Sequence, residues 1–289
     1  MNYILFYKGK LPSYTDYCIN SILSIDKDSK IYFLTDSKVD FHNDRVIVVN
    51  LLSINSIYIE KLNDLNYFAG DNNPLWESSL MRIFYINEFI NMKEINEFVH
   101  FDLDVLIYKS FKEVQNIFLN NKINITPLTK NFLVFGYCYI PTLQLFTKLS
   151  DMLFKILENK KFYEEKYYNS QRLNEMKMLY IAYDEKPELF NLLNVLPNDK
   201  SSFLFDPGSY GQYLGGTHKK KFSKGFIDKD HIAGIEILNQ NVKPILFKNT
   251  YYVEKNNRMF DLVNLHVHSK KLKNFLPQNY SKQVKISKL

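Results

Sequence analysis

The sequence predicts an α/β protein with parallel strands, and three observations lead to that prediction. Between Tyr3 and Thr35 the pattern runs strand, helix, strand, which is typical of a βαβ unit. Further along, an apolar strand pattern ends in two aspartates, at the kind of position where ligands bind in parallel sheets. The chain has no internal repeat and no long linker of proline, glycine or serine. We therefore expect one compact domain with a more irregular C-terminal third.

The N-terminal elements form the first βαβ unit. Apolar runs over 3–7, 30–35 and 45–50 predict three strands. Ser13 is the expected cap of a helix that continues to about residue 25. Lys8 and Asp36 follow the first two strands directly. Because the carboxyl ends of parallel strands meet at one edge of a sheet, both are candidate substrate-binding residues.

A predicted helix over 76–91 is apolar on nearly all sides and should be buried. Arg82 lies in its middle, and a buried guanidinium requires an anionic partner. A salt bridge to Glu77 or Glu88 would be the structural explanation. The functional explanation is that Arg82 reaches a metal site or substrate phosphates.

The elements that follow alternate between strands and helices. The pattern predicts a short helix near 111–119, strands near 123–126 and 132–140, an amphipathic helix over 142–159, a charged surface connection over 160–168 and a helix over 169–183. The amphipathic helix has a packing role only. Glu175, in the last of these helices, has no assigned role.

Composition limits the classes of protein to which the chain can belong. With 46% hydrophobic and 16% aromatic residues among 289, it can bury a large core and is not disordered. A formal charge of +6 is too mild for a nucleic-acid partner and suits an anionic small substrate or an anionic membrane surface. Cys18 and Cys138 lack metal-ligand spacing, which favours a reducing compartment. No apolar run reaches the roughly 18 residues of a membrane span, and the first run is too short for a signal peptide, so we expect a cytoplasmic protein.

Two aspartates interrupt the most informative strand pattern, which begins near Phe98. Residues two apart on an extended chain point to the same side, so Asp102 and Asp104 should converge. Close carboxylates in an apolar setting repel each other and lose hydration, and a divalent cation relieves both penalties. Their hard oxygen atoms suit Mg²⁺ or Mn²⁺. The structural alternative is a turn at the strand end that the aspartates cap.

A glycine-rich stretch over 203–217 is the second informative segment. Glycine gathers where the backbone takes positive φ or approaches a ligand closely. Asp206 stands at a strand end there, among polar and aromatic side chains that could bind a sugar. The alternative is a structural loop in which Asp206 caps a turn, and the lysine run over 218–221 is either solvated or a basic lid over phosphates. Four of the chain's nine glycines belong to this stretch: Gly208, Gly211, Gly215 and Gly216.

Two histidines in a late strand pattern form the third informative segment. Apolar residues alternate with them, so His266 and His268 share one face of the strand. Imidazole is a good ligand for Mn²⁺, although a single histidine is more often structural. Lys270 and Lys271 lie directly after them and could neutralise a leaving diphosphate.

Together these stretches resemble metal-dependent glycosyltransferases of the GT-A fold, which use nucleotide-sugar donors. The resemblance covers nearly the whole chain, from the βαβ pattern and the arginine-bearing helix to the Asp-x-Asp strand and the late histidine and lysine. It implies a Rossmann-type three-layer sandwich with a mixed central sheet. It also implies a catalytic domain over 1–269, with a nucleotide-binding half (1–108) and an acceptor half (109–269), and a basic tail over 270–289.

The resemblance implies the metal and donor residues. Asp102, Asp104 and either His266 or His268 would hold Mn²⁺ or Mg²⁺ on the donor diphosphate. Arg82 matches an arginine that contacts the donor in the retaining family that includes glycogenin and bacterial galactosyltransferases. That family's late motif with a Lys-Pro-Trp ending is absent here, so the stereochemistry stays open.

The resemblance also implies the sugar-side residues. Asp206 and Gln212 look like acceptor-side or donor-sugar residues of that group and are the candidate catalytic residues. If the enzyme inverts, Asp206 is the first candidate for the base; if it retains, both side chains only orient sugars. Gly211, Gly215 and Gly216 would line the substrate. The stretches over 206–216 and 264–270 resemble, more closely, bacterial glycosyltransferases of surface-polysaccharide assembly.

We therefore expect a hexosyltransferase that moves a sugar from a nucleotide-sugar, with a UDP-sugar favoured, to a glycan or lipid-linked acceptor. One rival class is a phosphohydrolase of the haloacid dehalogenase type, but its Asp-x-Asp motif normally opens the fold. The other is a non-catalytic carbohydrate-binding protein. Lysines and apolar residues over 270–289 either contact an anionic inner membrane face or form a solvated tail.

Overall fold

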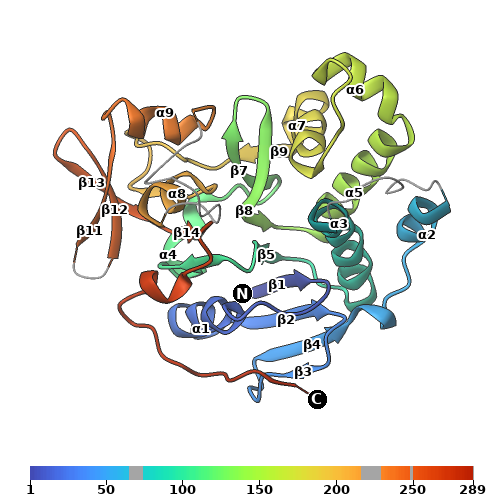
Figure 1. Ribbon diagram of the computed structural model, residues 1–289, viewed down its shortest axis with the longest axis horizontal. Coiled ribbons are helices and arrows are strands. Elements are labelled where there is room, and N and C mark those ends of the chain that lie inside the picture. Colours follow the sequence, from blue (N-terminus) through green and yellow to red (C-terminus); the bar gives the residue numbers. More distant parts are fainter. Residues whose placement is uncertain (65–73, 216–228, 248–249, 289) are drawn as a thin grey trace.

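The computed structural model describes residues 1–64, 74–215, 229–247 and 250–288 (Figure 1). Its centre is a mixed sheet whose strand order is β4-β2-β1-β5-β8-β7-β9, seven strands within the described ranges. Strands β4, β2, β1 and β5 are parallel to one another, β8 is antiparallel to both β5 and β7, and β9 is parallel to β7. The prediction of an α/β fold with a mixed central sheet is therefore confirmed.

The strands of this sheet are short and mostly buried. Their bounds are β1 (Asn2–Tyr7), β2 (Lys30–Thr35), β4 (Val46–Asn50), β5 (Phe98–His100), β7 (Ile123–Thr129), β8 (Phe132–Ile140) and β9 (Phe190–Leu192). The first two strands begin and end within a residue of the predicted positions, because their uninterrupted apolar runs pack on both faces. Outside the sheet are β3 (Val39–Asp40) and β6 (Val105–Ile107).

Helices cover both faces of the sheet, which gives three layers (Figure 1). Helix α1 (Thr15–Ile25) packs on one face with Cys18 and Ile19, and the C-terminal elements extend the same core. The opposite face is covered by α3 (Pro74–Lys93), α5 (Leu143–Glu158) and α7 (Glu175–Glu185). The remaining helices are α2 (Ile57–Asp64), α4 (Phe111–Val114), α6 (Lys160–Tyr168), α8 (Ser209–Gly215) and α9 (Ile232–Leu238), and the 3₁₀ turns are η1 (Leu51–Ser53), η2 (Gln115–Ile117), η3 (Pro187–Leu189) and η4 (Leu272–Phe275).

Three local predictions differ from the structure. Ser13 does not cap α1, because Tyr14 holds the N-cap position without a side-chain hydrogen bond. The predicted surface connection over 160–168 is the helix α6, which buries Tyr168 on its inner side. The next helix begins later than expected, since Asn169 has a φ of 48° that ends α6 and Asn174 caps α7.

The C-terminal third forms smaller sheets against the first core. Strands β10 (Phe203–Leu204), β13 (Arg258–Leu262), β12 (Thr250–Lys255) and β11 (Lys243–Phe247) lie in that order in one sheet. Strand β14 (Asn264–His266) instead pairs antiparallel with β6. Because β6 directly follows the acid pair, this pairing brings the late histidines to the centre of the molecule.

The last described residues, which we expected as a separate basic tail, pack on the domain. The C-terminal segment, red in Figure 1, runs along α1, and its strand β15 (Ser287–Lys288) pairs with β3. Asn20 on α1 accepts hydrogen bonds from the backbone of Gln283 and Val284. Leu272 and Val284 are buried in the core, so these apolar side chains do not face a membrane.

Two further findings concern the cysteines and the length of the helices. Cys18 and Cys138 are buried and free. In the part of the chain that the structure describes, no helix combines the length and apolarity needed to cross a bilayer.

Candidate metal and substrate site

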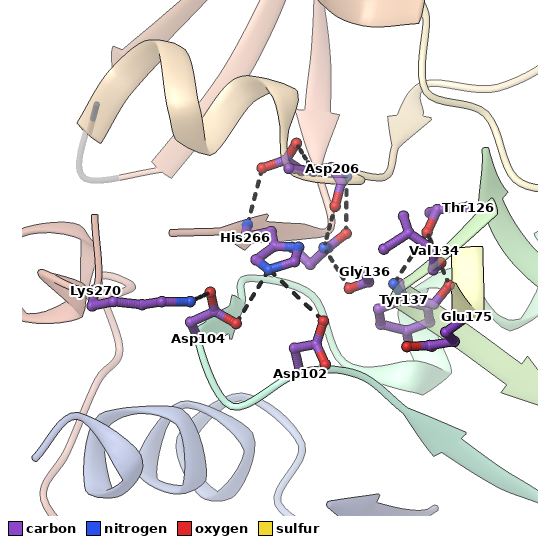
Figure 2. A network of polar contacts seen from close by, with 12 residues as sticks. Asp102, Asp104, Thr126, Val134, Gly136, Tyr137, Glu175, Asp206, His266 and Lys270 are labelled. Atoms are coloured by element: carbon purple, nitrogen blue, oxygen red, sulfur yellow. Dashed lines mark hydrogen bonds and ion pairs between the residues drawn. The ribbon is translucent and has the colours of Figure 1, made fainter. Parts of the chain in front are cut away.

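The acid pair lies in a tight turn at the carboxyl end of β5. In the central sheet, β5 lies between β1 and β8. The backbone N–H of Val105 donates to the carbonyl oxygen of Asp102 at 3.1 Å, and β6 begins there. The turn replaces the extended geometry that the sequence suggested. Both carboxylates nevertheless face the same side, toward β14 (Figure 2).

His266 completes a three-residue group with the two aspartates. In the β14–β6 pair, His266 stands opposite Val105, the residue after Asp104. Its Nε2 atom lies 3.2 Å from Oδ1 of Asp104 and 3.9 Å from Oδ2 of Asp102. One ligand atom from each residue lies within 4.8 Å of the others (Figure 2). Among the described residues, no other group of three or more histidine, cysteine or acidic side chains lies so close together. The structure therefore brings together three of the four residues predicted to bind metal.

In each aspartate, one carboxylate oxygen contacts a basic side chain and the other faces the histidine. Arg82 contacts Oδ1 of Asp102, and Lys270 contacts Oδ2 of Asp104. The other oxygen of each aspartate faces Nε2 of His266. This leaves two oxygens and one imidazole nitrogen within 4.8 Å of one another, and such a mixed set fits Mn²⁺ and, less closely, Mg²⁺.

Electrostatics keep both aspartates ionised. Burial opposes ionisation of Asp104, but His266 and Lys270 hold the pKa of its carboxyl below the usual range. Burial acts in the same way on Asp102, and Arg82 with His266 lowers the pKa of that carboxyl. The site therefore presents charged oxygens; because, against the effect of burial, the two acids also raise the pKa of His266, a metal bound there would displace the proton of that imidazole.

Arg82 pairs with neither of the two glutamates expected as its structural partners and instead contacts Asp102, a candidate metal ligand. Its guanidinium is buried, contacts Asp102 through one terminal nitrogen and donates to Oε1 of Glu175 at 2.6 Å through the other. The Phe135 ring lies against it, with 5.1 Å between the guanidinium carbon and the ring centroid. The expected structural partners are engaged elsewhere: Glu77 pairs with Lys8, and Glu88 accepts from Ser56.

Glu175 is a third acidic residue of the site, and no role was predicted for it from the sequence. It begins helix α7, whose N-cap Asn174 accepts from the backbone N–H of Lys177. Burial raises the pKa of the Glu175 carboxyl to about 7, against the opposing charge of Arg82. A carboxylate in the first turn after a side-chain cap was visible in the sequence, but nothing there linked it to Arg82.

His268 lies beside the three-residue group without belonging to it. Its ring centroid is 4.6 Å from that of His266, at an interplanar angle of 30°. A Cβ atom added at Gly208, whose φ is +125°, would lie 2.5 Å from Nε2 of His268, so this glycine makes room for the ring. The two histidines therefore differ: His266 faces the acids, whereas His268 lines the cleft beside them.

Asp206 binds backbone and has no free oxygen for a substrate. It is fully buried, and Oδ1 accepts from the N–H groups of Gly208 and Tyr210 while Oδ2 accepts from those of Gly211 and His266. Four donors around one carboxylate fix the loop before α8 to β14. Figure 2 shows the contact of Asp206 with the backbone N–H of His266. The structure thus differs from the predicted base, and we propose that Asp206 positions His266.

Asn264, which the sequence did not single out, strengthens the same connection. Its side-chain N–H₂ donates to the carbonyl oxygens of Gly136 and Asp206, and its Oδ1 accepts from the backbone N–H of Asp206. It therefore ties β14 to β8 and to the Asp206 loop. Its place two residues before His266, on the same face of the strand, was the available signal.

Replacing Asp206 with Asn should destabilise the protein by about 3 kcal/mol. The new amide N–H₂ would face two backbone donors in place of an acceptor, so two hydrogen bonds to a charged oxygen are lost and their buried donors stay unpaired. Urea denaturation followed by circular dichroism measures this change. Asp151→Asn, an exposed aspartate that accepts from Tyr58, is the matched control; equal stability of the two variants would contradict the buried hydrogen-bonding role.

Gly211 and Gly215, two of the other residues predicted on the sugar side, pack against protein atoms. A Cβ atom at Gly211 would lie 1.9 Å from the carbonyl oxygen of His266, and one at Gly215 would lie 3.0 Å from the Phe275 ring. These two glycines let α8 pack on β14 and η4. Gln212 is buried, and its Oε1 atom has no hydrogen-bond partner among the described residues. Gly216 and the lysine run over 218–221 lie outside the described residues.

Three other predicted substrate-binding residues, Lys8, Asp36 and Lys271, do not line the cleft. Lys8 pairs with Glu77 at 3.1 Å, and Asp36 accepts from the backbone N–H of Gly9 at 2.7 Å. Lys271 is exposed at the start of η4. Within the described chain, the cleft is lined by Lys270 but by none of these three.

A cleft of about 400 Å³ opens over the acids, which is large enough for part of a small ligand. Tyr7, Tyr14 and Trp76 supply aromatic surface to its wall, and His266, His268 and Lys270 close the side near the acids. A larger hollow of about 910 Å³ lies between α1 and the C-terminal segment, but it contains none of the predicted site residues.

Comparisons with known proteins return solved structures of similar arrangement. No model of a protein family matches the chain, and no curated protein matches it in sequence. Mouse xyloside xylosyltransferase 1 in its apo form is 14% identical, with 67% of this chain and 86% of that chain covered and a TM-score of 0.46. Galactosyltransferase LgtC in complex with donor and acceptor sugar analogs is 12% identical, with 67% and 73% covered and a TM-score of 0.40. The apo form of glycosyltransferase GlyE from Streptococcus pneumoniae is 10% identical, with 67% and 44% covered and a TM-score of 0.40.

Proposed function

We propose that this protein is a metal-dependent glycosyltransferase that moves a sugar from a nucleotide-sugar, a UDP-sugar in the first place, to a glycan or lipid-linked acceptor. One observation carries the proposal. Asp102, Asp104 and His266 bring one ligand atom each within 4.8 Å of the others, at the carboxyl edge of the parallel strands and beside a cleft with aromatic walls. This edge is where open α/β sheets bind nucleotides.

The three residues would hold Mn²⁺ or Mg²⁺ through Oδ2 of Asp102, Oδ1 of Asp104 and Nε2 of His266. A metal bound there supplies Lewis-acid stabilisation of the charge that develops on a leaving diphosphate. Lys270 adds positive charge on the same side. Its side chain is 41% exposed and reaches Asp104 from the open part of the cleft, so the ammonium group can also bind phosphate oxygens.

The chain's other side chains would bind and orient the donor and the acceptor. Tyr14 and Trp76 offer ring faces on which a nucleobase or a sugar can stack. His268 presents a ring to the same cleft and can hydrogen-bond a sugar hydroxyl. Asp206 fixes the backbone of His266, so the histidine stays aligned with the acids.

A turnover screen tests the proposal. The purified protein is incubated with a panel of nucleotide-sugars and separately with phosphate esters, in Mn²⁺, in Mg²⁺ and in EDTA. We expect release of nucleoside diphosphate from at least one nucleotide-sugar, in the presence of metal and not in EDTA. Release of inorganic phosphate from the esters alone would instead support the phosphohydrolase class. Metal-dependent binding of sugar without any turnover would support the carbohydrate-binding class.

A further inference from the structure

A third carboxylate is connected to the acid pair through one guanidinium. Arg82 contacts Asp102 with one terminal nitrogen and Glu175 with the other, and both Arg82 and Glu175 are buried. Glu175 comes from α7, whereas Asp102 follows β5 and Arg82 comes from α3. Three separate elements therefore contribute one charged side chain each to a network beside the cleft.

A buried arginine needs one carboxylate, and here it has two. The contact with Asp102 alone would already compensate the guanidinium charge. The second carboxylate is costly, because burial raises the pKa of Glu175 to about 7 in spite of the adjacent arginine. Compensation of the arginine charge alone does not require a second buried acid at this point.

The net charge of the side chains that line the cleft indicates a role for Glu175. Among the described residues that line the cleft, the acids are Asp102, Asp104 and Glu175, and the permanent cations are Arg82 and Lys270. Without Glu175, two carboxylates would face two cations, and no net negative charge would remain to attract a dication. With Glu175 in its ionised form, one negative charge is left over. Hard divalent cations depend on such unbalanced carboxylate charge.

Geometry supports the same role. Glu175 draws one side of the planar guanidinium toward α7, at 2.6 Å, and the Phe135 ring holds its face. Arg82 is thereby limited to Oδ1 of Asp102, and Oδ2 stays directed at His266. If Glu175 were neutral, the full guanidinium charge would act on Asp102 and weaken its oxygens as ligands.

We propose that Glu175 is a positioning residue of the metal site, which acts through Arg82 and supplies the negative charge that lets Asp102 and Asp104 hold a divalent cation. This inference rests on the proposed function only in requiring that the acid cluster binds a metal. In this role Glu175 is not itself a ligand of the cation.

Titration with Mn²⁺ alone, by isothermal calorimetry at pH 8, tests the inference. Glu175→Gln keeps an oxygen that can accept from Arg82 and removes the charge. We expect the Kd for Mn²⁺ to rise about tenfold in this variant. Glu88→Gln, a partly buried glutamate on the same helix as Arg82 and outside the cleft, should bind as the wild type does. Circular dichroism verifies that each variant is folded.

Each outcome separates the inference from the proposed function. If the wild type binds no Mn²⁺, the proposed function fails and the inference fails with it. If Glu175→Gln binds Mn²⁺ as tightly as the wild type, the inference alone is overturned. Glu175→Asp retains the charge in a shorter side chain and should keep most of the affinity, even if Glu175→Gln does not fold. Equal losses in the aspartate and glutamine variants would show that side-chain shape matters rather than charge, and would also overturn the inference.

Discussion

Replacing Asp104 with Asn is expected to reduce sugar transfer to background, a loss of roughly 10³-fold. Asp104 is 5% exposed and turns Oδ1 to His266 and Oδ2 to Lys270, so it joins the metal group to the lysine proposed for the phosphates. Loss of a residue next to a metal ligand already lowers metal affinity by about 10- to 100-fold, and loss of a ligand should cost at least as much. Removal of one electrostatic stabiliser of a transition state costs a further factor of roughly 10² to 10³. Nucleoside diphosphate release and Mn²⁺ titration measure the two effects.

The fold should survive this substitution. The asparagine amide oxygen can occupy the place of Oδ1, and the neutral side chain removes the repulsion between the two aspartates. Asp151→Asn on α5, on the opposite face of the sheet, is the control for a change of aspartate to asparagine. Near-normal transfer by a folded Asp104→Asn protein would remove Asp104 from the proposed mechanism.

The sequence predicted the fold where local pattern determines structure. The βαβ unit, the buried helix α3 and the long strand β8 depend on continuous apolar runs, and these are visible in sequence. It was also predicted that Asp102 and Asp104 point to the same side. The prediction assumed an extended strand, whereas the structure has a turn there. The approach of His266 to them depends on the pairing of β14 with β6, which links residues far apart in the sequence.

The sequence could not predict which polar residues serve the backbone and which face the cleft. Asp206 follows a strand just as Asp102 does, yet four backbone N–H groups surround its carboxylate. Glu175 is one acid among many on predicted helices, and only the packing of α7 against α3 joins it to Arg82. Hydrogen bonds of this kind depend on tertiary contacts, and amino-acid pattern does not contain them.

The C-terminal residues illustrate the same limit. Their mixture of lysines and apolar residues fits a membrane-facing tail as well as it fits a packed segment. In the structure Leu272 and Val284 enter the core, and Asn20 of α1 fixes the backbone beside Val284. Whether these residues pack or face a membrane depends on the surface of α1 that they contact, and α1 lies near the other end of the sequence.

Replacing Gly211 with Ala should destabilise the protein by about 3 kcal/mol or more and weaken Mn²⁺ binding. The added Cβ atom would lie 1.9 Å from the carbonyl oxygen of His266 and 2.6 Å from its carbonyl carbon. These are backbone atoms, so α8 or β14 has to move. Overpacking of this kind costs roughly 1–3 kcal/mol or more, which exceeds the ~1 kcal/mol that alanine gains over glycine in a helix. Chemical denaturation measures the stability, and calorimetry measures the Mn²⁺ affinity.

Gly215→Ala, one turn further along α8, is the matched control for this prediction. Its Cβ atom would lie 3.0 Å from the Phe275 ring and 3.1 Å from Oγ of Ser269, and both contacts are ends of side chains that can rotate away. We therefore expect a smaller loss of stability and an unchanged Mn²⁺ affinity. Because β14 carries His266 and Oδ2 of Asp206 accepts from both Gly211 and His266, a shift at Gly211 must reach the metal group. A Gly211→Ala protein that is as stable as the wild type and binds Mn²⁺ equally well would mean that α8 does not position the histidine.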